Sequence, residues 1–116
     1  MIKSINPYST YILSDRKRNT FYIGVTDNLE RRVLQHKTGV GSIFTKKYQI
    51  KVLLHFEIFP TMFQAIRREK QLKKWRREWK INLIKDTNPT LEDLAKDWFT
   101  EEMIDNYRQG TEHVED

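Results

Sequence analysis

The sequence predicts an α+β fold in which a small three-stranded antiparallel sheet is flanked by helices. Its 116 residues suffice for one hydrophobic core and one domain. Three short runs of aromatic and β-branched residues are typical of strands. The segments between and after these runs carry helix-capping residues and apolar positions at helical spacing. We expect the domain to occupy residues 1–96 and an acidic C-terminal tail to follow over residues 97–116.

The first two expected strands form a hairpin. They cover residues 8–14 and 20–25, and the polar segment between them is a turn. Alternation along a strand places Tyr22 and Gly24 on one face. Tyr11 lies on one face of the first strand, so we expect the two tyrosines to meet across the hairpin.

A short helix follows the hairpin. Asp27 and Glu30 have the spacing of a capping box, and Gly39 supplies a stop, so we expect about three turns between them. Arg32 and His36 are four residues apart and therefore lie on one helical face.

The third strand and the longest helix come next. Residues 50–58 are apolar enough for a central strand. The long helix begins at Thr61, which forms a capping box with Gln64, and it runs to about residue 85. One carboxylate, Glu69, lies within its apolar stripe. The stripe consists of Met62, Ala65, Ile66, Leu72, Trp79 and Leu83.

The C-terminal part is acidic where the rest is basic. Residues 1–96 carry a net charge of +11, and residues 97–116 carry −6. We expect a short helix over 90–95, then an amphipathic helix docked on the body and a frayed end from Gly110. The tail is expected to lie over the basic face and to compete there with a nucleic acid.

Composition excludes several classes of function. Without cysteine there is no disulfide framework, thiolate zinc site or cysteine nucleophile. Gly39 and Gly41 lack the third glycine of a dinucleotide fingerprint, so we expect no nucleotide cofactor. No apolar run approaches the ~18 residues of a membrane span, and residues 1–7 lack a signal-peptide core. We expect a cytoplasmic protein with no membrane partner.

The long helix interleaves cations with two tryptophans, a pattern typical of nucleic-acid binding. Cations engage phosphates and indoles stack on bases, whereas the alternative is a solvated basic face. We expect Leu72 and Trp79 to pack in the core and the charges to bind a substrate. The basic candidates for substrate binding are Arg68, Lys73, Lys74, Arg76 and Arg77.

Five further residues are candidates for chemistry, and each also has an ordinary structural interpretation. Glu69 within an apolar stripe requires a partner, either a metal ion or an arginine such as Arg32. Arg32 and His36 either clamp and protonate a phosphate or belong to an ordinary polar face. Tyr11 and Tyr22 are either strand aromatics or general bases activated by a nearby cation.

Taken in order, these residues resemble the GIY-YIG nuclease superfamily over about residues 8–95. Tyr22-Ile23-Gly24 matches the second signature of that superfamily, and Arg32, His36, Glu69 and Asn88 follow it in the expected order. The first signature departs from the pattern, because Ser9-Thr10-Tyr11 keeps only the tyrosine. Small stand-alone members are the most similar, and these resemble the N-terminal nuclease domain of excinuclease C, a DNA repair enzyme.

The resemblance implies metal-dependent hydrolysis of a DNA phosphodiester. It implies that Glu69 binds Mg²⁺ or Mn²⁺, that Arg32 contacts the phosphate, and that Tyr11 or Tyr22 takes a proton from water with help from His36. It assigns Gly24 and Asn88 to substrate contacts. The alternatives are a nucleic-acid-binding module on the same fold, or a nuclease that a partner protein directs to its target.

Overall fold

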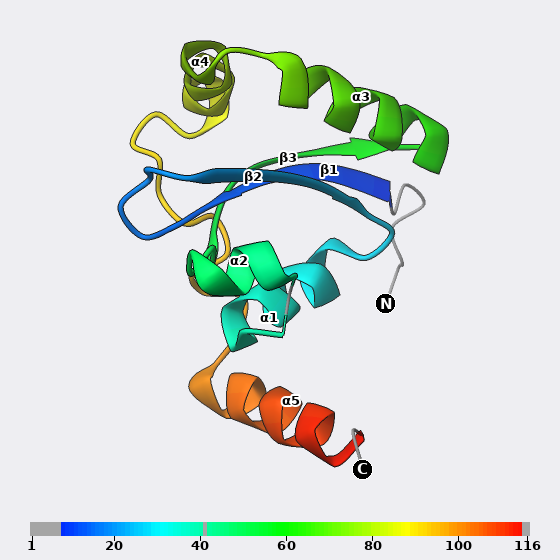
Figure 1. Ribbon diagram of the computed structural model, residues 1–116, viewed down its shortest axis with the longest axis vertical. Helices are drawn as coiled ribbons and strands as arrows, with labels where there is room; N and C mark the ends of the chain where they lie inside the picture. The colour runs from blue at the N-terminus through cyan, green and yellow to red at the C-terminus, as the bar shows by residue number, and fades with distance from the viewer. Residues whose placement is uncertain (1–7, 41, 115–116) are drawn as a thin grey trace.

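The computed structural model describes residues 8–40 and 42–114. Strands β1 (Tyr8–Ser14), β2 (Phe21–Thr26) and β3 (Val52–Phe59) form one antiparallel sheet in the order β2-β1-β3. Helices α3 and α4 cover one face, α1 and α2 lie on the other, and α5 lies beyond α1 (Figure 1). The α+β class with a three-stranded antiparallel sheet is confirmed. The helices are α1 (Leu29–Thr38), α2 (Ile43–Lys47), α3 (Met62–Lys74), α4 (Arg77–Thr87) and α5 (Glu101–Val114).

The central strand is β1, so the expectation that the third strand is central is wrong. All residues of β1 except the first are buried, and the strand pairs with both neighbours. The outer edge of β3 is covered by an irregular segment instead of a strand. Leu94 N donates to Leu53 O at 2.8 Å, and Leu53 N donates to the Asp93 carboxylate at 3.1 Å. The strand is apolar because Leu53 and Leu54 belong to the core clusters on opposite faces of the sheet.

The hairpin has the expected geometry. Tyr11 lies opposite Gly24 and Leu13 opposite Tyr22 in the β1–β2 register. The Tyr11 and Tyr22 rings are 6.4 Å apart between centroids, which confirms that they meet. Asp15 Oδ1 holds the turn by accepting from two backbone N–H groups.

One expected long helix is two helices. Its Thr61 cap is confirmed, because the hydroxyl accepts from Gln64 N at 3.2 Å. The helix ends at Lys74, since Trp75 and the next residue have extended backbone with ψ of 149° and 154°. Trp75 packs on the core cluster of this face, and the new direction of α4 leaves Trp79 48% exposed. The expectation that Trp79 is buried is wrong, whereas Leu72 is buried as expected.

The first helix is capped by Asn28, not by Asp27 as expected. Asn28 Oδ1 accepts from Arg31 N at 3.1 Å, and Gly39 ends the helix in the left-handed region as predicted, with φ of 84°. The five-residue helix α2 was not expected. Ser42 caps it, and its hydroxyl accepts from Thr45 N.

The segment after α4 is a series of turns, so the expected helix over 90–95 is wrong. Trp98 and Phe99 pack on the core, so the packed body extends beyond residue 96. Helix α5 runs through Gly110 to Val114, where fraying was expected. It packs on α1, and it lies on the side of the sheet opposite α3 and α4 (Figure 1). The expectation that the tail covers the basic helix face is therefore wrong.

Two apolar clusters form the core, one on each face of the sheet. Val33 of α1 belongs to the first, and Leu72 of α3 and Ile84 of α4 belong to the second. Over the ranges 8–40 and 42–114, the fold has no helix long and apolar enough to cross a bilayer.

Candidate active site

Two tyrosines form the centre of the candidate site, and Gly24 makes room for one of them. Tyr11 is 1% exposed and its ring crosses the backbone of Gly24 on the neighbouring strand. A Cβ atom at residue 24 would lie 2.5 Å from Tyr11 Cζ and nearer still to the hydroxyl oxygen. Only glycine lets the Tyr11 hydroxyl reach this place. Gly24 therefore makes the position of Tyr11 possible, and its expected substrate contact stays a prediction.

His36 packs against both tyrosines. Its ring centroid is 6.2 Å from that of Tyr11 and 5.7 Å from that of Tyr22. Both imidazole nitrogens are buried and lack a hydrogen-bond partner among the residues described. Burial, reinforced by the Arg32 charge, lowers the pKa of His36 to about 4. The ring is therefore neutral at pH 7.

Arg32 supplies a positive charge near Tyr11 and His36 from α1. Its side chain is half-buried, and within the described ranges it has no hydrogen bond or ion pair. Its charge lies near enough to Tyr11 to lower the pKa of that hydroxyl and near enough to His36 to lower the pKa of the imidazole. A half-buried guanidinium without an anion is a site where a phosphate is favoured.

Glu69 acts on Tyr11 from α3, a helix that lies on the face of the sheet opposite α1 (Figure 1). Its side chain is 16% exposed, and its Oε2 lies 3.3 Å from Nζ of Lys73 one turn later. The partner of Glu69 is thus a lysine of its own helix, not Arg32. The negative charge of Glu69 acts on Tyr11 and raises the pKa of its hydroxyl.

The two tyrosines differ in their surroundings. Burial, more than any neighbouring charge, raises the pKa of Tyr11 well above its usual value near 10. Tyr11 therefore keeps its proton at neutral pH. Tyr22 is partly exposed and lines an open cavity at the outer edge of β2. Of the two tyrosines, Tyr22 is the more exposed residue.

A metal ion at this site would have one protein carboxylate. Across the part of the chain that the structure describes, no three His, Asp or Glu side chains gather in a metal-binding group. Glu69 is the carboxylate whose charge acts on Tyr11, and its side chain is 16% exposed. Mg²⁺ is commonly held by one or two carboxylates together with substrate phosphates and water. The residues present fit that mode of binding.

Most of the predicted substrate-binding cations are engaged within the protein. Arg68 pairs with Glu57 through two contacts, at 2.8 and 3.1 Å, and lies over the Trp75 ring. Arg76 is 3.6 Å from Glu78. Arg77 donates to the Arg18 carbonyl and covers the Phe21 ring, and Lys73 pairs with Glu69. Lys74 is exposed and has no partner within the described ranges.

The buried Asn88 amide is bonded to the backbone, and its expected substrate contact stays a prediction. Its Nδ2 donates to Leu54 O at 3.2 Å and to Glu92 O at 2.8 Å. Its Oδ1 accepts from Glu92 N at 3.0 Å. All the hydrogen-bonding groups of the buried amide are thus occupied by backbone, and they fasten the segment after α4 to β3.

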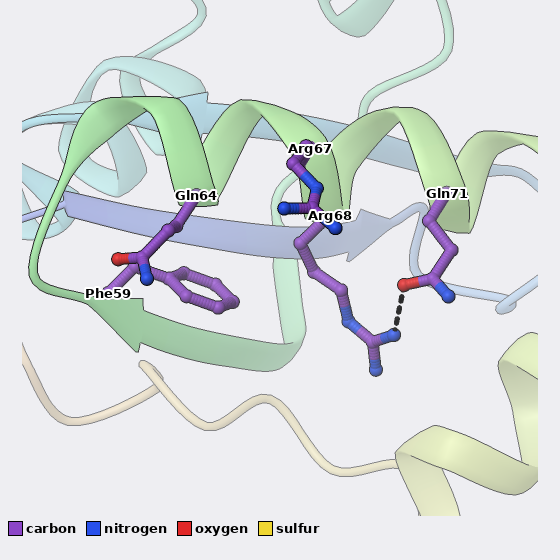
Figure 2. Close-up of a pocket in the computed structure, with 5 residues that line it drawn as sticks. All are labelled: Phe59, Gln64, Arg67, Arg68 and Gln71. Carbon is purple, nitrogen blue, oxygen red and sulfur yellow. Dashed lines mark hydrogen bonds between the residues drawn. The ribbon is translucent and has the colours of Figure 1, made fainter.

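Two features of the structure were missed from the sequence. A cavity of about 260 Å³ at the β2 edge includes Phe44 and Lys80, whose sequence neighbourhoods carry no recognisable motif. A second cavity, of about 410 Å³, lies between α3 and the end of β3 (Figure 2). It is on the opposite face of α3 from Glu69 and contains none of the candidate catalytic residues. Its lining residues are Phe59, Gln64, Arg67, Arg68 and Gln71.

Beside the second cavity a buried polar network joins β3 to α3. His55 Nε2 lies 2.8 Å from Glu57 Oε2, and Arg68 binds the same carboxylate. Although burial raises the pKa of Glu57, the hydrogen bonds from His55 and Arg68 lower it to about 2. The Glu57 carboxylate is ionised at neutral pH, so it forms an ion pair with the Arg68 guanidinium.

Comparison with known proteins identifies a family for this chain. The GIY-YIG catalytic domain family matches residues 7–82. UPF0213 protein SH2523 of Staphylococcus haemolyticus is 36% identical over 60% of this chain and 85% of its own length. A UPF0213 protein of Pediococcus pentosaceus is 36% identical over 80% of this chain and 97% of its own.

A solved structure is also similar. The solution NMR structure of UPF0213 protein BH0048 from Bacillus halodurans is 27% identical, with 80% of this chain and 98% of that chain covered and a TM-score of 0.49. The expected superfamily is confirmed, and its relatives here are UPF0213 proteins, not specifically proteins similar to excinuclease C.

Proposed function

Because this chain belongs to the GIY-YIG family, we propose that it is a metal-dependent endonuclease that hydrolyses phosphodiester bonds in DNA. The observation that supports this most is that two opposite charges, from two further elements, act on one tyrosine. Arg32 of α1 and Glu69 of α3 act from opposite faces of the sheet on the hydroxyl of Tyr11 in β1. An unpaired cation and a carboxylate at one hydroxyl suit a substrate that brings a phosphate.

Glu69 is the proposed ligand for Mg²⁺ or Mn²⁺. Its carboxylate now contacts the Lys73 ammonium at 3.3 Å, and that lysine would turn outward when a divalent ion binds. A divalent ion bound there supplies positive charge that stabilises the phosphate and the leaving oxygen. With one protein carboxylate, metal binding is expected to be weak until the substrate contributes oxygens of its own.

The remaining roles belong to side chains of the chain itself. The Arg32 guanidinium donates two parallel hydrogen bonds to the non-bridging oxygens of the phosphate. Tyr22, as its phenolate, is proposed to accept the proton of the attacking water and so become a phenol, because this residue lines an open cavity. Tyr11 keeps its proton and donates a hydrogen bond within the site. His36, neutral and packed between the two rings, is a positioning residue.

Nicking of supercoiled plasmid tests the proposal. The wild type is expected to nick DNA with Mg²⁺ or Mn²⁺ and not with EDTA. Glu69→Gln and Arg32→Ala are each expected to lose about 10²-fold or more in rate, as for groups that stabilise transition-state charge.

Two control substitutions are matched to the Glu69 and Arg32 variants. Glu78→Gln changes an exposed carboxylate of α4, and Arg31→Ala changes the exposed neighbour of Arg32. Both are expected to keep wild-type activity. If no metal supports nicking, or if Glu69→Gln cuts as well as Glu78→Gln, the nuclease proposal is refuted. Salt-sensitive DNA binding without cutting would instead support a binding module.

A further inference from the structure

We infer that the cavity at the outer edge of β2 binds an unpaired nucleobase next to the scissile phosphate. The inference rests on the proposed function and adds a substrate class to it: single-stranded or locally unpaired DNA. The cavity measures about 260 Å³. That is just below the range of ~300–1,000 Å³ typical of drug-sized ligands, and it suits one base. Its lining residues are Phe21, Tyr22, Ile23, Phe44, Lys73 and Lys80.

The cavity follows the edge of the sheet. Successive residues of a strand point to opposite faces, so a space lined by residues 21, 22 and 23 together lies along the free side of β2. Phe44 reaches it from α2 below the sheet, and Lys73 and Lys80 reach it from α3 and α4 above (Figure 1). A strand of nucleic acid laid along this edge would meet aromatic rings on one side and ammonium groups on the other.

The cavity adjoins the candidate catalytic groups. Tyr22 belongs to both, because its ring lines the cavity and packs 5.7 Å from that of His36. Lys73 also belongs to both, since it lines the cavity and lies 3.3 Å from Glu69. A base held in the cavity would therefore have its own phosphate close to Glu69 and Tyr22.

The aromatic side of the cavity is exposed where core residues would be buried. Phe44 and Tyr48 are each 43% exposed, and they lie four residues apart on one side of α2. The Phe44 ring is stacked on Tyr22 at 6.1 Å and 28°, and it lies 4.8 Å from the Tyr48 ring. Lys47 stands over Tyr48 at 5.3 Å. The result is an open row of rings with cations beside it.

Such a row matches the chemistry of an unpaired base. Exposed aromatic rings stack on bases of any type, and lysines beside them neutralise the flanking phosphates. In a duplex both faces of a base are already covered by its neighbours, so a paired base has no free face for Phe44. The cavity thus favours strands whose bases are unstacked.

Binding without cutting tests the inference directly. Glu69→Gln protein is titrated with an oligonucleotide that carries 2-aminopurine, either single-stranded or as a blunt duplex of the same sequence. Stacking on Phe44 is expected to quench the single-strand fluorescence, and the single strand is expected to bind at least about tenfold more tightly than the duplex. Adding Phe44→Leu should remove the quenching and weaken single-strand binding by about tenfold.

The matched control is Phe63→Leu, which changes another exposed phenylalanine, 69% exposed and outside the cavity. It should leave binding and quenching unchanged. Lys80→Gln should reduce the salt dependence of binding by about one phosphate contact without removing the quenching. Duplex binding as tight as that of the single strand, or quenching that survives Phe44→Leu, overturns the inference.

Cleavage by protein that retains Glu69 separates this inference from the proposed function. Equal cutting of duplex and single strand, unaffected by Phe44→Leu, overturns the base-binding cavity and leaves the nuclease intact. Base binding that depends on Phe44, with no metal-dependent cutting of any substrate, supports the cavity and refutes the nuclease.

Discussion

Replacing Gly24 by alanine places a methyl group where the Tyr11 side chain already lies. The added carbon would be 2.5 Å from Tyr11 Cζ and 3.0 Å from Cε1, well inside van der Waals contact. Tyr11 is 1% exposed on the central strand, so its ring has no free space into which it can move. Forcing extra volume into a packed core costs about 1–3 kcal/mol. We expect Gly24→Ala to lose that much free energy of unfolding and to move the Tyr11 hydroxyl.

Two other glycines serve as controls for this substitution. An added carbon at Gly110 meets no atom within 4 Å, and alanine is favoured in a helix, so Gly110→Ala is expected to gain about 0.5–1 kcal/mol. Gly39 also has free space, but its φ of 84° disfavours a side chain, so Gly39→Ala should lose about 1–2 kcal/mol.

Urea unfolding followed by circular dichroism measures all three, and plasmid nicking measures the site. Gly24→Ala is expected to lose nicking activity as well as stability, whereas Gly39→Ala should lose stability alone. An unfolding midpoint for Gly24→Ala equal to that of the wild type, with an unchanged slope, would show that Tyr11 does not occupy this space and would refute the reasoning.

Three further outcomes are expected. The pKa of His36 is lowered to about 4 from 6.5, so its contribution to the free energy of unfolding is fully present above pH 6.5, and up to about 3 kcal/mol of it is lost as pH falls toward 4. The free energy of unfolding of the wild type should therefore fall more steeply over that pH range than that of His36→Phe. Parallel curves of unfolding free energy against pH for the two proteins would contradict this expectation. Asn88→Ala removes three backbone hydrogen bonds and should cost about 2–3 kcal/mol in thermal or urea unfolding, against no change for exposed Asn82→Ala. Truncation after Thr100 keeps the packed Trp98 and Phe99. It should alter DNA affinity at physiological salt less than twofold, because α5 lies away from α3 and α4 (Figure 1). A tenfold gain in affinity in a binding titration would instead support competition between the acidic tail and DNA.

Local signals in the sequence predicted the elements that local physics determines. Three such features are confirmed: the Thr61 cap, the Gly39 stop and the ring contact between Tyr11 and Tyr22. Each depends on neighbours in the chain or on one hairpin. Asn28 replaced Asp27 as the cap because both types suit that position and only the path of the incoming backbone decides between them.

Tertiary packing decided the features that were predicted wrongly. The long helix breaks at Trp75 because that indole packs on the core, a contact that helical periodicity cannot reveal. Leu53 and Leu54 of β3 are buried in the core clusters on the two faces of the sheet, and a segment about forty residues away covers part of its outer edge, so an apolar run was mistaken for a central strand.

The sequence indicated the candidate site residues one by one, but it did not indicate which side chains contact them. The position of Glu69 within an apolar stripe indicated that its carboxylate needs a cation. In the structure that cation is Lys73 of the same helix. Phe44 lies in the site through an unexpected helix, because a five-residue helix has too little periodicity to recognise.

The segment that fastens to the outer edge of β3 also protects the protein from self-association. An uncovered strand edge presents free N–H and C=O groups to which another chain can add. Here Asp93, Leu94 and Asn88 occupy those groups at Leu53 and Leu54. Substitutions that release this segment would therefore do more than lower stability, because they would expose an apolar edge and make aggregation depend on protein concentration.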